Sequence, residues 1–198
     1  MKEGDLMKLA RLFGWIFATV LLMACLPSCS DTGGAVDARK SGVTVESLEK
    51  ELANGDWNFE QTKTKSGISF THTGSNLSVS SSYIGSADKK GNVYSILIRH
   101  NGVDTEALKD QFSIAKLLIK IAKKPDLMTV NDIGACTCAL DLMEIESLCG
   151  LTDRNDTTAT VVVRLADVFN GKTLTGNGWK ISASVTSDMV TISAEYGR

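Results

Sequence analysis

The sequence predicts an α+β fold, in which an antiparallel sheet of about seven or eight strands, with strong curvature allowed, packs one face against an inserted helix pair. Apolar and polar residues alternate in the N-terminal and C-terminal parts of the domain, which is typical of strands buried on one side. The middle of the chain instead repeats apolar residues at helical spacing. Short turns between the strands favour antiparallel neighbours, because parallel neighbours need long crossovers.

A short N-terminal helix is expected to open the domain. Thr44 suits its N-cap, and Asn54-Gly55 provides a stop. About four strands follow, separated by Gly- and Asn-containing breaks. Their inward-facing residues are predicted to be Trp57, Phe59, Ile68, Phe70, Leu77, Val79, Tyr83, Tyr94, Ile96 and Ile98.

Two helices form the predicted insertion. The first is expected over residues 104–123, with Asp104 as its N-cap, and it ends before Pro125. The second is expected to begin after the N-cap Thr129, with Asp132 at N3, and to end before Gly150.

A row of lysines lies on the outer face of the first predicted helix. Its members are Lys109, Lys116, Lys120 and Lys123, with Ser113 among them. The row is either a solvated face or a surface that contacts anionic lipid or an acidic partner. Asp141 and Glu144 of the next helix are expected to neutralise part of it.

The C-terminal part of the chain is predicted to return to the sheet. Strands are expected over residues 159–165, 179–185 and 190–196, where apolar side chains occupy every second position. Ser187-Asp188 suits a tight hairpin between the last two of these strands.

The composition excludes several classes of protein. In 198 residues, 21 basic side chains stand against 23 acidic ones, whereas a nucleic-acid-binding protein needs a basic excess. The hydrophobic content of 43% is too high for a disordered chain, and two prolines exclude a proline-rich one. We therefore expect one globular domain with no nucleic-acid partner.

The first 28 residues are interpreted as an export signal. An apolar run of about fifteen residues follows Lys8 and Arg11, and it is shorter than a permanent membrane span. Met1 and Met7 are both possible starts, and Met7 opens the cleaner basic region.

The end of this signal resembles a bacterial lipobox. Leu26-Pro27-Ser28-Cys29-Ser30-Asp31 is similar to the corresponding segment of envelope lipoproteins of the Bacteroidota. The resemblance implies an acylated Cys29, with Cys25 as the alternative, on the outer membrane, and it leaves the periplasmic or surface face open. The predicted organisation is a signal over 1–28, a lipidated cysteine and tether over 29–43, and one α+β domain over 44–198. A plain signal peptide or a short anchor is the competing interpretation.

Three cysteines remain in the domain: Cys136, Cys138 and Cys149. They occupy apolar helical positions, and Cys138 and Cys149 would stand about 16 Å apart on a straight helix, too far for a disulfide. Buried thiols are therefore expected, against a disulfide in a broken helix or a metal site, for which the spacing is atypical. His72 and His100 are interpreted as strand-end residues.

No catalytic motif of hydrolases, metalloproteases or nucleotide-binding proteins is present in the sequence. The leading hypothesis is a non-enzymatic envelope protein that binds a partner protein or a small apolar ligand, without cofactor or metal. The alternative is an envelope hydrolase or a thiol-dependent enzyme that uses one of the three cysteines. Asp156-Thr157-Thr158 resembles the short O-glycosylation acceptor of Bacteroidota envelope proteins, which implies a modification at Thr157.

Overall fold

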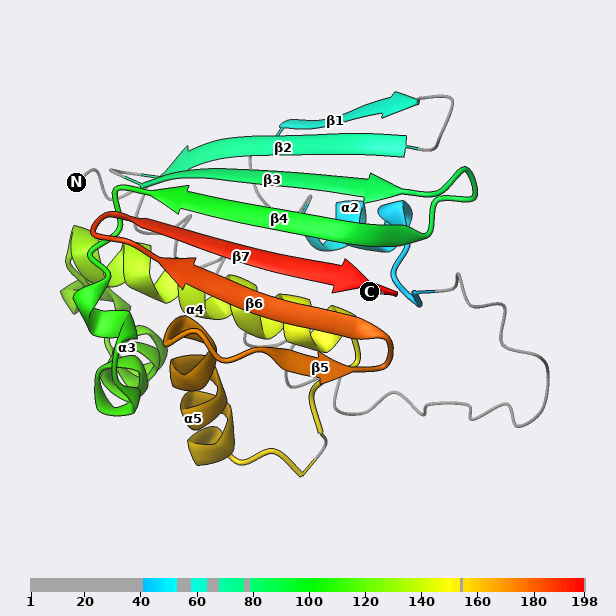
Figure 1. Cartoon of the computed structure of the whole chain (residues 1–198). Coiled ribbons are helices and arrows are strands. Elements are labelled where there is room, and N and C mark those ends of the chain that lie inside the picture. The colour runs from blue at the N-terminus through cyan, green and yellow to red at the C-terminus, as the bar shows by residue number, and fades with distance from the viewer. Residues whose placement is uncertain (1–40, 53–57, 64–67, 77–78, 154, 198) are drawn as a thin grey trace.

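The computed structural model describes residues 41–52, 58–63, 68–76, 79–153 and 155–197. Its single open antiparallel sheet has the strand order β1-β2-β3-β4-β7-β6-β5 (Figure 1). The α+β class and the antiparallel sheet are confirmed. The elements are α2 (Val45–Leu52), β1 (Asn58–Lys63), β2 (Ile68–Asn76), β3 (Val79–Ala87), β4 (Val93–Asn101), the 3₁₀ turn η1 (Glu106–Leu108), α3 (Gln111–Lys123), the 3₁₀ turn η2 (Pro125–Leu127), α4 (Val130–Leu148), α5 (Thr158–Phe169), β5 (Leu174–Gly176), β6 (Trp179–Val185) and β7 (Met189–Tyr196).

The helices gather on one face of the sheet, and this face carries the core. Ile96 and Ile98 of β4 are buried in contact with the helices, whereas Arg99 on the opposite face is exposed. The same alternation runs along β7, where Val190 and Ile192 are buried. Figure 1 shows α4 crossing behind β6 and β7. Among the described residues, no helix combines the length and the apolarity that a membrane span needs.

Helix α4 begins and ends as the sequence predicts. Thr129 accepts a hydrogen bond from the Asp132 amide, and the Asp132 carboxylate accepts one from the Thr129 amide, so a capping box is complete. At the other end Gly150 has φ +67°. The Gly150 amide donates to the Ser147 carbonyl and the Leu151 amide to the Glu146 carbonyl, which is the Schellman arrangement.

The strand predicted over residues 159–165 is wrong, because this segment is helix α5. The Thr157 hydroxyl caps the helix by accepting from the Thr160 amide. Buried residues then recur at Val162, Leu165 and Phe169, which is helical spacing. Three helices, α3, α4 and α5, therefore lie between the two groups of strands, where two were predicted. The first strand predicted in the C-terminal part is not in the sheet.

The first inserted helix starts later than predicted. Asp104 precedes the turn η1, and the N-cap of α3 is Asp110, whose side chain accepts from the Phe112 and Ser113 amides. Asp110 has the extended backbone of an N-cap, whereas Thr105, which precedes η1, has a helical backbone and no capping hydrogen bond from its side chain.

The folded domain begins before the predicted boundary at residue 44. Val43 is buried in the core, and its carbonyl accepts from the Val93 amide at 2.8 Å. Ser41 is also buried, and the indole Nε1 of Trp179 donates to its carbonyl at 3.0 Å. The end of the predicted tether is thus part of the domain. Thr44 caps α2 as predicted, through Ser47, whereas Asn54-Gly55 lies outside the described residues.

The prediction that Asp141 neutralises part of the lysine row is wrong. Lys120 pairs with the capping carboxylate of Asp132 at 2.6 Å, and Lys109 pairs with Glu106. Asp141 does not face the row, because it is buried against the sheet. The charge of Lys120 on α3 is therefore neutralised by the carboxylate that caps the start of α4.

Helix α5 is joined to α4 by one buried charge network. Arg164 donates through Nε to Glu146 Oε2 and through Nη1 to Asp156 Oδ2, both at 2.7 Å. Glu146 is fully buried, and its Oε1 has no hydrogen-bond partner within the described structure. Burial raises the pKa of Glu146 above its ordinary value and outweighs the opposite effect of Arg164.

The raised pKa of Glu146 predicts how the Glu146→Gln variant behaves with pH. The folded state holds the Glu146 proton to a higher pH than the unfolded state does. The free energy of unfolding of the wild type therefore falls as pH rises through the folded pKa of Glu146. Glutamine cannot ionise, so the stability of the variant relative to wild type should improve from pH 4 to pH 7. Urea unfolding across this range measures the difference. A Glu146→Gln difference that stays constant across this range would contradict the expectation.

Candidate functional site

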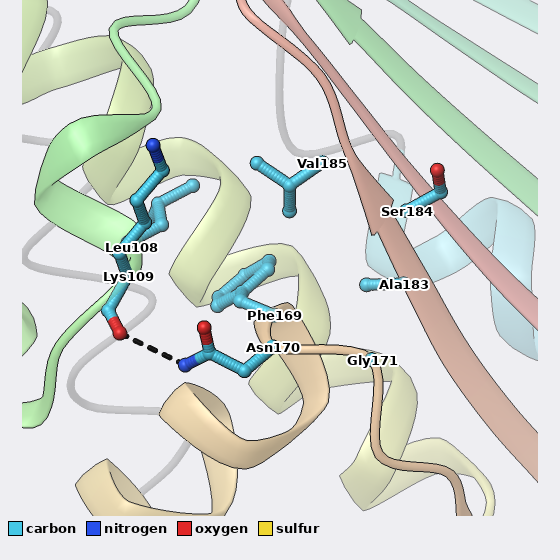
Figure 2. Close-up of a pocket in the computed structure, with 8 residues that line it drawn as sticks. All are labelled: Leu108, Lys109, Phe169, Asn170, Gly171, Ala183, Ser184 and Val185. Carbon is cyan, nitrogen blue, oxygen red and sulfur yellow. Dashed lines mark hydrogen bonds between the residues drawn. The ribbon is translucent and has the colours of Figure 1, made fainter.

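A pocket of about 410 Å³ opens where the end of β6 faces η1 and the C-terminal end of α5. Figure 2 shows the side chains of Leu108, Phe169 and Val185 directed into this space from three different elements. The lining residues are Leu108, Lys109, Phe169, Asn170, Gly171, Ala183, Ser184 and Val185. The volume lies within the range of ligand sites, and the lining combines apolar and polar groups.

The Asn170 side chain fixes one wall of the pocket. Its Nδ2 donates to the carbonyl of Lys109 and to that of Ala166, both at 2.8 Å (Figure 2). Asn170 is the C-cap of α5, so one amide joins the end of this helix to the segment that follows η1. The two helical walls therefore keep their separation without filling the space between them.

The opposite wall is fixed at the β6–β7 hairpin. Thr105 is buried, and its Oγ1 donates to the Thr186 carbonyl at 2.9 Å. The Val103 amide donates to the Asp188 carbonyl at 3.0 Å. These bonds hold the end of β6 against the chain that leads into η1, so the pocket is held at both of its sides.

A second polar cluster, which the sequence did not predict, lies between the sheet and α4. Ser81 Oγ lies 2.7 Å from His100 Nδ1, and Asp141 Oδ2 lies 2.7 Å from His100 Nε2. The Tyr83 hydroxyl donates to the same Asp141 oxygen at 2.7 Å. His100 lies next to the last residue of β4, as predicted, and it is fully buried at the centre of this cluster, which the sequence did not predict.

The cluster contains the residue types of a serine hydrolase, but its geometry suits a structural role. Ser81 is 7% exposed and His100 is 0% exposed, so a substrate carbonyl has no room beside the hydroxyl. Burial, and then the charge of Asp141, raise the pKa of Tyr83 well above its ordinary value, so the phenol stays a hydrogen-bond donor. The cluster ties α4 to β3 and β4 through Asp141, although His100 Nε2 makes a close contact with Asp141 Oδ2 and no hydrogen bond of good geometry among the described residues.

The three domain cysteines are free and buried, as predicted. Burial raises the pKa of Cys136 and of Cys149 to about 12, and it raises that of Cys138 well above the ordinary range. A nearby carboxylate raises each pKa further: Asp132 acts on Cys136, Glu146 on Cys149 and Asp141 on Cys138. A catalytic cysteine needs the opposite environment, exposed and electropositive.

The remaining predicted residues fall partly outside the described structure. Thr157 is exposed, as a modification site requires, but its hydroxyl is engaged as the N-cap of α5. Cys25 and Cys29 lie outside the described residues, as does the side chain of His72. Within the described ranges, no three His, Cys, Asp or Glu side chains are grouped so that they could hold a metal ion.

The burial of the cysteines predicts their reactivity. At pH 8, a thiol with a pKa of about 12 is ionised to roughly one part in ten thousand, so iodoacetamide should leave Cys136, Cys138 and Cys149 unmodified in the folded protein. All three should react after denaturation in urea. Peptide mass spectrometry of the two samples locates the label. Rapid modification of any one of them in the native protein would contradict their placement.

Comparison with known proteins finds no relative of this chain. No family model matches it, and neither the curated proteins nor the solved structures contain a match. The pocket beside β6 is therefore judged by its own geometry. Its volume of about 410 Å³ and its fixed walls, which carry both apolar and polar groups, make it the candidate functional site.

Proposed function

We propose that the chain is a lipid-anchored envelope protein whose domain is a non-enzymatic binding module. The observation that carries the proposal is the pocket of about 410 Å³ beside β6. A surface concavity of this size, lined by apolar side chains and a few polar groups, lies in the volume range of small-ligand sites. The apolar residues Leu108, Phe169 and Val185 favour an apolar group of the ligand or partner.

Binding is favoured over catalysis by the environments of the candidate nucleophiles. The three thiols are buried and have raised pKa values, and Ser81 is enclosed beside His100. The polar groups at the pocket are Lys109, Asn170 and Ser184, of which Lys109 is paired with Glu106. This set can orient a ligand, but it offers no base next to the Ser184 hydroxyl.

The anchor is supported by the sequence that precedes the domain. A basic start, an apolar run and a lipobox-like Ser28-Cys29 are arranged as in Bacteroidota envelope lipoproteins. Acylation at Cys29 would leave a short connection to Ser41, the first described residue of the domain. In this arrangement the pocket is presented close to the outer membrane, on its periplasmic or its surface side.

The proposed anchor predicts the result of acyl labelling. The Cys29→Ala variant should lose incorporation of a clickable palmitate analogue and leave the membrane fraction, because its acceptor thiol is gone. The Cys25→Ala variant is the matched control and should keep both. Labelling that persists in Cys29→Ala and disappears in Cys25→Ala would move the anchor to Cys25. Labelling that persists in both would contradict a lipobox in this chain.

The pocket predicts binding of a small apolar probe such as indole. Indole should shift the NMR methyl signals of Val185 and Leu108, and Ala183→Leu should weaken its binding about tenfold or more, because the larger side chain occupies the pocket. Thr175→Leu, on exposed β5, is the control and should bind as the wild type does. Equal binding by both variants, or no shift at Val185 and Leu108, would refute the binding site.

A further inference from the structure

Strand β5 covers only half of β6, and the pocket begins where β5 is missing. Residues Leu174–Gly176 pair with Trp179–Ile181. On its other side β6 pairs with β7 along its whole length, to Val185. Among the described residues, one edge of β6 is therefore without a strand from Ser182 to Val185.

The direction of the main-chain groups along this edge follows from the ladder with β7. Hydrogen bonds from Thr186 to Met189 and from Gly197 to Gly178 close the two ends of the β6–β7 pairing. Hydrogen-bonded residues of an antiparallel pair alternate, so the even-numbered residues of β6 bond to β7. The odd-numbered residues direct their amides and carbonyls to the opposite side.

Two of these odd-numbered residues meet a neighbouring strand and two do not. Trp179 and Ile181 bond to β5. The amides and carbonyls of Ala183 and Val185 have no main-chain or side-chain partner in the part of the chain that the structure describes. Four hydrogen-bonding groups are thus presented at the spacing of a β-strand.

The pocket lies alongside these four groups. Ala183 and Val185 belong to its lining, and their side chains lie on the same face of β6 as the buried Trp179 and Ile181. A strand paired with them would direct its own paired side chains to that face, because opposite residues of a sheet share a face. Those side chains would enter the apolar space.

We propose that this groove binds an extended peptide of another protein, which adds to β6 as an antiparallel strand in line with β5. Two of its side chains, opposite Ala183 and Val185, enter the pocket and are apolar. The residue between them lies opposite Ser184 on the outer, solvent-facing side and is polar. The proposal rests on the pocket being a binding site, and it specifies the ligand as a strand of alternating apolar and polar residues.

The free edge itself favours a peptide over a small apolar molecule. A small molecule in the pocket would leave the amides and carbonyls of Ala183 and Val185 unmatched, whereas a strand would pair them. Proteins usually protect such an edge with a charge, a proline, a bulge, or a helix or loop that covers it. The segment Ser182 to Val185 has no charge, proline or bulge, and the end of α5 that faces it leaves the pocket between them.

Hydrogen exchange in the full-length lipidated protein, held in lipid nanodiscs, tests the proposal. The probe is the peptide acetyl-Lys-Val-Thr-Val-Lys-amide. Without it, the Ala183 and Val185 amides should exchange freely, while those of Ser182 and Ser184 are protected by β7. With saturating peptide, the exchange of Ala183 and Val185 should slow about tenfold or more. The same peptide with both valine amides N-methylated should give no protection, because it lacks the donors.

The Ala183→Pro variant separates strand pairing from occupation of the pocket. Proline removes the amide that faces the free edge, a position where sheets tolerate it, and it should abolish protection at Val185 by the peptide. Ala183→Ser keeps the amide and should bind the peptide. Both variants should still bind indole, since the pocket remains open.

These measurements distinguish a failed inference from a failed function. If indole binds but the peptide protects neither amide, or the N-methylated peptide protects equally, strand addition is overturned and the pocket survives as a small-molecule site. If the two amides are already protected without peptide, by another part of the chain or by a second copy, the proposal is also overturned. If indole does not bind, the proposed function itself falls.

Discussion

Asp141 holds the central helix against the sheet. Its carboxylate contacts His100 of β4 and accepts from the Tyr83 hydroxyl of β3, so one residue of α4 joins two neighbouring strands. Removing one partner of a buried hydrogen bond typically destabilises a protein by about 1–3 kcal/mol, because the other group stays buried without a partner. A rotation or a shift of α4 along its axis would also separate Asp141 from His100 and Tyr83. These contacts therefore fix the orientation of α4 on the sheet. Helices α3 and α5 pack against α4, and the walls of the pocket take their places from it.

The composition of α4 follows from this position. Buried residues occupy more than one face of the helix, including Gly134, Ala135 and Ala139. Small side chains let the helix approach both the sheet and its neighbouring helices closely. Cys136 and Cys138 belong to the same set, and they act as small apolar residues whose thiols stay protonated. The cysteine spacing thus reflects packing, and the chemistry of the domain has to be sought at its surface.

Local signals were sufficient to predict α4, but they were insufficient where two periodicities overlap. The Thr129 cap and Gly150 are short-range features, and both hold. Residues 159–165 alternate as a strand does, yet the same segment also fits a helix, and packing against α3 and β6 decides between them. Asp104 and Asp110 are equally good caps by residue type, so the start of α3 depended on tertiary contacts.

The sites were less predictable than the elements, because each assembles residues that are distant in the chain. Ser81, His100 and Asp141 meet only when α4 packs on the sheet, and a lone histidine in a strand carries no sign of it. The pocket joins η1, the end of α5 and β6. The one available signal was the uncharged, proline-free segment Ser182 to Val185, which is unusual for an edge. The anchor at Cys29 rests on the sequence and stays a prediction.

The attachment of Ser41 and Val43 has a mechanical consequence. A domain held by an N-terminal anchor receives any pull at this point of entry. The first bonds to carry that load are those from Trp179 to Ser41 and from Val93 to Val43, in β6 and β4. Force is therefore divided between two strands on either side of β7 before it reaches α2. The far end of β6, with its open edge, lies at the opposite end of the strand from Trp179 and is remote from the load.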